Sequence, residues 1–363
     1  MASVRDHDFL PYETGRVVLR RFEPDDVPVL SAYRSDPEVA RYQDWSVPFG
    51  ADAAAELVAA QADLAGPAPG RWIQVGIEHA GELVGDVAIR LDGSGALATL
   101  GYTLRVDHQG LGLGVEAVGA AVDRLFVLIG VHRVGATLDP DNAPSARLLE
   151  RLGFRYEGRA VAVAAVRGEW LDDDMYALLA ADRAAWLARP TSAPSDVRLV
   201  EVDAHNLPRL TAVEVHHSQQ RFVPSVRDAL VEVLVPPVVR GVALSLRVHG
   251  IEADGQVVGL IGLSSPTATE PGVRLRWLLV DRWHQRRGIG AAAVRLAADL
   301  ARAGGHATLR ARWPVARGGP APFFAATGFV VTSVTGDAIE GELDLAGCGR
   351  RDSNPHALAG TGT

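Results

Sequence analysis

The chain has 363 residues, 48% of them apolar and 22% charged, which is typical of a globular protein with room for two domains. Its net charge of −8 argues against a general nucleic-acid-binding surface. Residues 1–8 are too polar for a signal peptide and no apolar run is long enough to cross a bilayer, so we expect a cytoplasmic protein without a membrane partner. The lone cysteine, Cys348, excludes internal disulfides and Cys-ligated zinc, and the sequence predicts no metal site.

The first half alternates predicted strands and helices. Residues 16–22 are predicted to form an apolar-rich strand, and Asp25 and Asp26 precede a predicted helix at residues 27–33. The next predicted elements, in chain order, are strands at 72–78, 83–91 and 98–106, a helix at 115–129, a strand at 133–138, a helix at 143–152, strands at 155–164 and 169–178, and a helix ending near Leu187.

Composition divides the chain into two domains and a tail. Residues 188–196 are rich in Pro and Ser, which indicates a linker between a domain at 1–187 and a second domain at 197–346. Mixed strands followed by helices predict an α/β (α+β) fold for both domains. Residues 347–363 match neither domain and are predicted to be disordered. The run Asp-Ser-Asn-Pro at 352–355 is what the complement of a tRNA T-loop would encode, so we hypothesise that the reading frame runs into a tRNA gene.

Two glycine-rich loops carry the most information. The sequence Gln-Gly-Leu-Gly-Leu-Gly at 109–114 recurs as Gln-Arg-Arg-Gly-Ile-Gly at 285–290, 176 residues later and again before an alanine-rich helical segment. A Gly-Phe pair at 153–154 recurs at 328–329, with an offset of 175 residues. These nearly equal offsets indicate duplication of one domain. Glycines at a helix start let main-chain N–H groups wrap a phosphate, and the helix dipole strengthens the attraction.

Two other interpretations of the loops compete. Glycine can simply serve a tight strand-to-helix turn, although duplication of the whole loop argues against this. Residues 112–117 also match the G-x-G-x-x-A dinucleotide fingerprint, with Asp139 near the expected acidic position. That fingerprint belongs after the first strand of its fold, whereas three or more predicted strands precede residue 112.

The Q-x-x-G-x-G loop after a central strand resembles the pyrophosphate loop of the GNAT superfamily of N-acetyltransferases. Residues 197–345 resemble this superfamily less closely than the first half does, and their runs at 219–223 and 341–343 are similar to its spermine/spermidine acetyltransferase branch. The resemblance implies two tandem domains, each with a mixed, centrally splayed sheet flanked by helices. Residues 15–187 resemble the ribosomal-protein-alanine acetyltransferase (RimJ/RimL-like) branch in the runs 16–22, 35–39, 101–102, 109–117, 141–145, 149–154 and 168–170.

The resemblance also implies acetyl-CoA as the acyl donor, held at both loops. Backbone groups near Leu104 to Val106 in the first domain, and near Leu278 to Val280 in the second, would line the gap that holds the thioester. Asn142 is expected either at the cofactor or as a helix cap. The expected pyrophosphate contacts are Gln109, Gly110, Leu111, Gly112, Leu113 and Gly114, and then Gln285, Arg286, Arg287, Gly288, Ile289 and Gly290.

Ser145 is the general acid that this branch implies for the departing thiolate. It is preferred because Leu149 and Phe324 stand where the superfamily often places Tyr. Like Asn142, Ser145 can equally cap the following helix.

No general base is identified from the sequence. Thr99 stands where the branch often carries Glu, and the alternatives are Asp86, His79 or a chain of water molecules. Trp45 and Trp170 are expected either to line the acceptor pocket or, more simply, to pack in the core.

We therefore predict a tandem N-acetyltransferase that moves acetyl from acetyl-CoA to a primary amine by direct transfer. The first domain is the predicted active one, because residues 317–320 of the second contain neither Asn nor Ser. The alternative is an acyl-CoA-binding or scaffold protein with one or both domains inert. The acceptor is open between protein N-termini, polyamines, aminoglycosides and small amines, and the chain is either a monomer with pseudo-dimeric domains or a homodimer.

Overall fold

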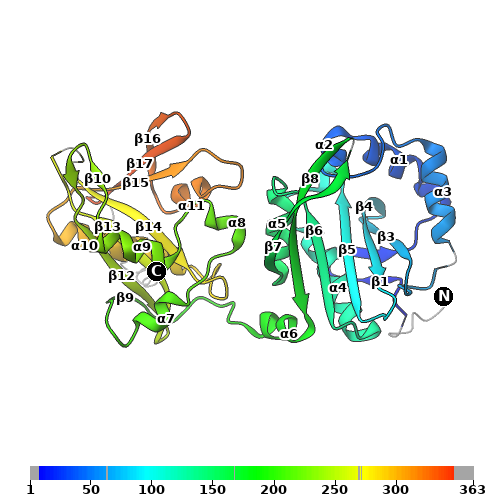
Figure 1. The fold of residues 1–363 in the computed structure, drawn as a ribbon, viewed down its shortest axis with the longest axis horizontal. Helices are drawn as coiled ribbons and strands as arrows, with labels where there is room; N and C mark the ends of the chain where they lie inside the picture. The colour runs from blue at the N-terminus through cyan, green and yellow to red at the C-terminus, as the bar shows by residue number, and fades with distance from the viewer. Residues whose placement is uncertain (1–7, 63, 167, 269, 271, 347–363) are drawn as a thin grey trace, which may run out of the picture. The chain divides into compact units, whose positions relative to one another are not determined.

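The structure is a computed structural model that describes residues 8–62, 64–166, 168–268, 270 and 272–346 (Figure 1). The predicted tail at 347–363, with the hypothesis about its origin, lies outside the described residues. The chain divides into two compact units, residues 1–188 and 189–363. Within the described ranges, no helix is long and apolar enough to cross a membrane.

The first unit is a mixed sheet with helices on both faces (Figure 1). Its elements are β1 (Tyr12–Glu13), β2 (Val17–Arg20), η1 (Pro24–Asp26), α1 (Val27–Ser35), α2 (Pro37–Ala40), α3 (Ala51–Gln61), β3 (Trp72–His79), β4 (Glu82–Leu91), β5 (Leu97–Leu104), η2 (Val106–His108), α4 (Leu113–Arg124), η3 (Leu125–Ile129), β6 (Arg133–Leu138), α5 (Ala143–Leu152), β7 (Arg155–Val166), β8 (Glu169–Leu179) and α6 (Ala180–Ala188). The strand order over the described residues is β1-β2-β3-β4-β5-β6-β8-β7, with only β5 and β6 parallel. Helices α4 and α5 close the larger core, and α1–α3 close a smaller apolar cluster.

The second unit repeats this plan on a shorter sheet. Its elements are β9 (Val197–Glu201), α7 (Leu207–Thr211), α8 (His217–Gln220), α9 (Val226–Leu234), β10 (Val238–Val239), β11 (Val242–Ala243), β12 (Leu246–Ala253), β13 (Gln256–Ser264), β14 (Val273–Val280), α10 (Ile289–Ala303), β15 (Thr308–Pro314), α11 (Ala321–Ala326), β16 (Val330–Thr335) and β17 (Ala338–Asp344). Its main sheet has the order β16-β17-β15-β14-β13-β12-β9, in which β14 and β15 form the parallel pair among the described strands. Helices α10 and α11 close one core, whereas α7 and α9 contribute to a second. The predicted mixed α/β fold with two similar units is therefore confirmed.

In each unit the two central parallel strands pair only briefly and then separate. Strands β5 and β6 pair from Leu97 opposite Arg133 to Thr99 opposite Gly135, and β14 and β15 pair over an equally short stretch. Residues 100–104 and 276–280 therefore continue without a ladder partner on that side. This is the centrally splayed sheet that the family resemblance implies.

Helix α5 illustrates how the sequence fixes element boundaries. The side-chain oxygen of Asn142 accepts a hydrogen bond from the Ser145 amide at 3.2 Å, so the capping role open to either residue falls to Asn142. The helix ends at Gly153, whose φ of +98° is left-handed. A Cβ there would lie 2.6 Å from the Trp186 ring, so only glycine fits.

Three sequence expectations differ from the structure. The predicted strand at 98–106 ends at Leu104, because η2 turns the chain there. The predicted helix at 115–129 is α-helical only to Arg124 and continues as the π-helical turn η3. The core-packing expectation for Trp170 is wrong: this side chain is 69% exposed near the turn of the β7–β8 hairpin. Trp45 is half-buried, and its ring centroid lies 4.5 Å from the Arg34 guanidinium.

Strands β4 and β5 approach each other closely at Gly85. Gly85 pairs with Leu104, and a Cβ on Gly85 would lie 2.2 Å from the Thr103 carbonyl oxygen. We expect Gly85→Ala to lower the free energy of unfolding of the first unit by about 1–3 kcal/mol, because the backbone must shift. Chemical denaturation checks this. Gly93→Ala is the matched control, since nothing lies within 4 Å of a Cβ there; equal loss in both variants would contradict the steric argument.

Candidate functional site

The first glycine loop, residues 109–114, has the main-chain geometry of a phosphate cradle. Gly110 and Gly112 have left-handed φ values of +77° and +82°, and α4 begins at Leu113. Among the described residues, the amides of residues 110–115 donate no hydrogen bond to a protein acceptor. Nothing lies within 4 Å of the position that a Cβ on Gly110 would take. Unused amides at a helix N-terminus, next to open space, fit a pyrophosphate group.

The second loop, residues 285–290, has nearly the same backbone. Gly288 has a φ of +80°, and Arg286 adopts a φ of +62° where the first loop has Gly110. A left-handed arginine is uncommon, so the loop keeps this conformation at some cost in strain. In the described part of the unit, the amides of residues 286–291 are also without a protein acceptor.

Both glutamines tie their loop to the end of the splayed strand. The Gln109 side-chain amide donates to the Leu104 carbonyl at 3.0 Å, and the Gln285 amide donates to the Val280 carbonyl at 2.9 Å. Gln285 also exchanges two hydrogen bonds with Gln219 at 2.8 and 3.1 Å. These side chains therefore shape the loops.

The remaining loop side chains differ in exposure. Leu111 is 57% exposed, whereas Leu113 and Ile289 are each 1% exposed in the cores. Gly114 and Gly290 pack closely against the following helices, since a Cβ on them would lie 3.0 Å from Leu148 and 3.3 Å from Phe323, respectively. The first loop consequently offers a ligand mainly its backbone, whereas the second also exposes the Arg286 side chain.

Arg16 supports the first loop from the neighbouring strand end. Its guanidinium donates to the Leu111 carbonyl at 2.9 Å and to the Glu116 carboxylate at 2.7 Å. A terminal nitrogen of Arg16 lies 3.3 Å from the position of a Cβ on Gly112. The guanidinium is half-exposed but paired with the Glu116 carboxylate, so its contact with Leu111 braces the loop. The sequence pattern gave no sign of this contact between strand and loop.

The expected gap residues lie at different levels of the splay. Leu104 ends β5 and packs against the main core, and Val280 holds the same place at the end of β14. Val106 lies beyond the strand in η2, where it lines a hollow of about 600 Å³ with Tyr33 and Arg105. Within β5, the backbone that continues past the paired stretch is that of residues 100–104.

Ser145 forms a short hydrogen bond with a residue that sequence reasoning missed. The hydroxyl groups of Tyr102 and Ser145 are 2.6 Å apart, which joins the unpaired part of β5 to the first turn of α5 across the splay. Burial raises the pKa of the Tyr102 phenol above its usual value, even though the Ser145 hydrogen bond lowers it. The phenol therefore stays protonated at neutral pH. In the sequence, Tyr102 stands out only within the Gly101-Tyr102 run that resembles the family.

The candidate bases lie in unlike surroundings. Asp86 is buried, accepts hydrogen bonds from Tyr33 at 2.6 Å and Arg34 at 3.0 Å, and so belongs to an internal ion pair. His79 lies at the end of β3, where its Nδ1 is 2.8 Å from the Arg16 carbonyl oxygen. Thr99 is exposed and carries no titratable group.

The second unit carries different side chains at the equivalent strand positions. Strands β5 and β14 both end opposite a glycine, since Leu104 pairs with Gly85 and Val280 pairs with Gly259. Counting back from these ends, Tyr102 corresponds to Leu278. The segment before and into α11, residues 317–323, contains no Ser, Thr or Tyr. The hydroxyl pair of the first unit is absent from the described residues at these positions.

Gly101 corresponds in the same way to Trp277. The position of a Cβ on Gly101 has only the Ala88 Cβ within 4 Å, at 3.7 Å, so the face of β5 opposite Tyr102 is open there. Trp277 is 7% exposed and belongs to the apolar core between β13, β14 and helices α7 and α9. Its indole therefore fills the space that the first unit leaves open.

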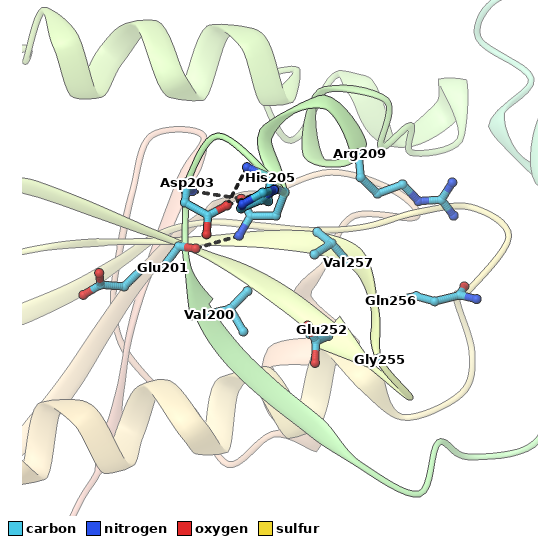
Figure 2. Close-up of a pocket in the computed structure, with 10 residues that line it drawn as sticks. Val200, Glu201, Asp203, His205, Arg209, Glu252, Gly255, Gln256 and Val257 are labelled. Carbon is cyan, nitrogen blue, oxygen red and sulfur yellow. Dashed lines mark hydrogen bonds between the residues drawn. The ribbon is translucent and has the colours of Figure 1, made fainter.

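A further hollow of about 720 Å³ lies at the edge of the second unit (Figure 2). It is lined by β9, the turn before α7 and the β12–β13 hairpin, and none of its residues belongs to the loop at 285–290. Its hydrogen bonds are local: Asp203 accepts the amides of His205 and Asn206, both at 2.9 Å. Among the described side chains, no group of His, Cys, Asp and Glu is arranged to hold a metal ion. We assign no chemistry to this hollow.

His216, at the start of α8, makes the second unit sensitive to acid. Burial, with Arg282 and Arg189 nearby, lowers its pKa from 6.5 to about 4. The unfolded chain binds this proton below pH 6.5 and the folded unit only near pH 4. Stability is therefore complete above pH 6.5 and is lost as the pH falls toward 4, by up to roughly 3 kcal/mol.

Denaturation between pH 7 and pH 4 checks this prediction. We expect His216→Gln to lose less stability than wild type across that window, because glutamine does not titrate. A second variant without a titratable group, His216→Asn, should show the same reduced loss as His216→Gln. An identical slope in all three proteins would show that His216 is not responsible.

Comparisons with known proteins agree with this geometry. The family pattern described as Acetyltransferase (GNAT) domain matches residues 16–155, and that described as Acetyltransferase (GNAT) family matches residues 239–316. The uncharacterized N-acetyltransferase p20 of Bacillus licheniformis is 30% identical over 167 residues, which cover 46% of this chain and 94% of that protein. The ribosomal protein uS5-alanine N-acetyltransferase of Escherichia coli (strain K12) is 39% identical over 83 residues, 23% of this chain and 43% of that protein.

A solved structure, Mycobacterium smegmatis RimJ in complex with CoA-disulfide, is 25% identical, with a TM-score of 0.43 over 48% of this chain and 91% of that one. The two family matches fall one in each unit and include both glycine loops. The predicted superfamily, the enzyme class and acetyl-CoA as donor are thereby confirmed. The chain belongs to the GNAT acetyltransferase family, carries two GNAT domains in tandem, and is an acetyl-CoA-dependent N-acetyltransferase.

Proposed function

We propose that the first unit transfers acetyl from acetyl-CoA directly to a primary amine, with Ser145 as the proton donor. The 2.6 Å contact between Tyr102 and Ser145 carries this proposal, because it brings a protonated hydroxyl pair to the splayed strand. The unused amides of the loop lie at the end of the same strand, where Gln109 fixes the loop to Leu104.

In this reaction the amine nitrogen bonds to the thioester carbonyl carbon and the carbon–sulfur bond breaks. The amine loses one proton, and the departing thiolate receives one from Ser145. Tyr102 passes a proton to the serine through their hydrogen bond and regains one from solvent, so both hydroxyl groups end the cycle protonated. Within residues 100–104, the N–H groups that point away from β4 have no ladder partner on the β6 side. We place the thioester oxygen beside them, where they would stabilise the negative charge that develops in acyl transfer.

The open face at Gly101 supports access for the acceptor. Helices α4 and α5 cover the face of β5 that carries Tyr102, so an amine would approach from the other face. Thr99 and Gly101 lie on that other face, where alternate strand residues point. With Asp86 held by Arg34, we propose that water on this face receives the amine proton.

We propose that the second unit does not transfer acetyl. Leu278 replaces the tyrosine, residues 317–323 provide no hydroxyl, and Trp277 fills the acceptor face. Each of these changes alone would impair the reaction, and together they remove the proton donor and the acceptor space.

The acceptor of the first unit is proposed only as a class. The relative from Escherichia coli is named for an alanine of ribosomal protein uS5. We propose a primary amine, with a protein N-terminus as the first candidate to screen, followed by polyamines, aminoglycosides and small amines. A panel of these amines with acetyl-CoA, read by release of free thiol, identifies the acceptor.

Substitutions in the hydroxyl pair test the proposed mechanism. We expect Ser145→Ala to lower kcat by about 100-fold, because the thiolate loses its proton donor. Tyr102→Phe should lower kcat by about tenfold, because it acts through Ser145 by one hydrogen bond. The KM for acetyl-CoA should change little in either variant, since the loop is untouched. Normal turnover in Ser145→Ala would remove the serine from the mechanism.

Calorimetric titration of acetyl-CoA tests the two loops separately. We expect wild type to bind two equivalents, with one lost in Gly112→Val and the other in Gly288→Val. A side chain at either position strains a left-handed backbone by about 1–2 kcal/mol and blocks close approach of the phosphate. Gly130→Ala is the control, since Gly130 has a similar φ of +76° in open space outside both loops. Full binding in Gly112→Val would contradict the proposed site.

A further inference from the structure

Arg287 lies in the glycine loop of the second unit, but its side chain points away from the loop. The residue is 7% exposed, and its guanidinium donates to the Ser192 carbonyl at 2.8 Å and to the Asp254 carboxylate at 3.1 Å. A third contact joins the guanidinium nitrogen Nη1 to Nδ1 of His284 at 3.0 Å. Ser192 belongs to the segment that connects α6 to β9. The loop is thus bonded to the linker between the units.

Asp254 completes this connection from the β12–β13 turn. Its Oδ1 accepts hydrogen bonds from the Ser195 amide at 2.8 Å and the Ser195 hydroxyl at 2.7 Å. Its other oxygen, Oδ2, receives Arg287. One carboxylate therefore joins the end of the linker to the donor loop.

The first unit shows that the loop itself does not require this arginine. The equivalent position, 176 residues earlier, is Leu111, which is 57% exposed. The first loop nevertheless has the same left-handed turn and the same glutamine tie to its strand. Arg287 is consequently available for a purpose other than holding the loop in shape.

We propose that the second unit binds CoA as a ligand that it does not consume, and that occupancy of its loop is transmitted through Arg287 and Asp254 to the linker at residues 192–196. This inference rests on the proposed lack of transfer in the second unit. The recognised group is the pyrophosphate of CoA, whether or not an acyl group is attached, because the backbone amides of residues 286–291 supply the contacts.

The physical basis is ordering of the loop. A pyrophosphate on the amides restricts the backbone of residues 286–288, which carries the Arg287 contacts with Ser192 and Asp254. These contacts then open less often, and the Ser195 amide is better protected from exchange. Linkage requires the reverse effect as well: loosening the linker must weaken CoA binding by the same factor. The linker directly follows α6 of the first unit, so the effect reaches the chain segment that joins the two units.

Hydrogen–deuterium exchange on the full chain tests the proposal. Free CoA is the probe and no amine is added, so the result does not depend on turnover. We expect saturating CoA to slow exchange in a peptide spanning residues 190–197 by about fivefold or more, the lower end of typical coupling between sites. The slowing should disappear in Gly288→Val and persist in Gly112→Val. Unchanged exchange in wild type, or a response that survives Gly288→Val, would overturn the proposal.

Asp254→Asn tests the connection without touching the loop. Asparagine tolerates the left-handed φ of +49° at this position and keeps the side-chain shape. We expect it to remove the linker response and to raise the Kd of the second CoA site by about fivefold or more. The matched control is Asp299→Asn, which breaks an exposed 2.9 Å ion pair with Arg302 on α10 and should change neither readout. Wild-type affinity in Asp254→Asn would refute the coupling.

The outcomes separate this inference from the proposed function. If wild type binds one equivalent of CoA and loses it in Gly112→Val, the second unit holds no CoA and the inference fails, while transfer by the first unit stands. If Ser145→Ala turns over normally, the proposed mechanism fails, while binding and linker exchange still report on the second unit.

Discussion

In each unit the two central parallel strands hydrogen-bond over three residue pairs and then separate, and the other features of the site follow from that separation. Strands that diverge leave one side of β5 and one side of β14 with backbone groups that no neighbouring strand satisfies. Such groups are costly to bury unless a ligand or water pairs with them. The glycine loop follows at the same end of the strand, where Gln109 and Gln285 bond back to the last strand residue. The unpaired strand backbone, the glycine loop and the helix N-terminus therefore follow one another directly along the chain.

The same scaffold carries unlike side chains in the two units. Side chains on a strand alternate between faces, so two adjacent substitutions alter both faces of the splay at once. In the second unit, Leu278 stands at the position of Tyr102, on the face covered by the helix that follows the glycine loop. Trp277 stands at the position of Gly101, on the opposite face. Accommodating the indole requires Gly262 on the neighbouring strand, where a Cβ would lie 2.2 Å from the ring. The filled face is thus a packed arrangement supported by a second residue, and the fold alone does not determine activity.

Charged residues inside the first unit serve its structure. Arg34 and Asp86 are 4% and 2% exposed and form an ion pair at 3.0 Å that fastens α1 to β4. Gln74 accepts another hydrogen bond from Arg34 at 2.5 Å, and the Trp45 ring covers the guanidinium. Separating such a pair leaves an uncompensated buried charge, so Asp86 is poorly placed to take up a proton during catalysis.

The sequence by itself determined the duplication, the glycine loops and most of the strand and helix pattern. These are local features: left-handed glycines at a helix start, alternating apolar residues and a fixed offset between repeated motifs are all visible along the chain. It also singled out Ser145, although only through resemblance to a family branch.

Only the tertiary structure decided which of these residues meet. Tyr102 and Ser145 are 43 residues apart in sequence, and their contact depends on how far the strands diverge before α5 begins. Arg287 was expected at the cofactor through its backbone amide, and the structure adds that its side chain bonds to Ser192 and Asp254, which lie 95 and 33 residues earlier. Trp170 reads as a core residue from its chemistry, but the hairpin that carries it places it in solvent. Contacts between residues distant in sequence depend on packing of the whole unit, and a local pattern holds no information about that packing.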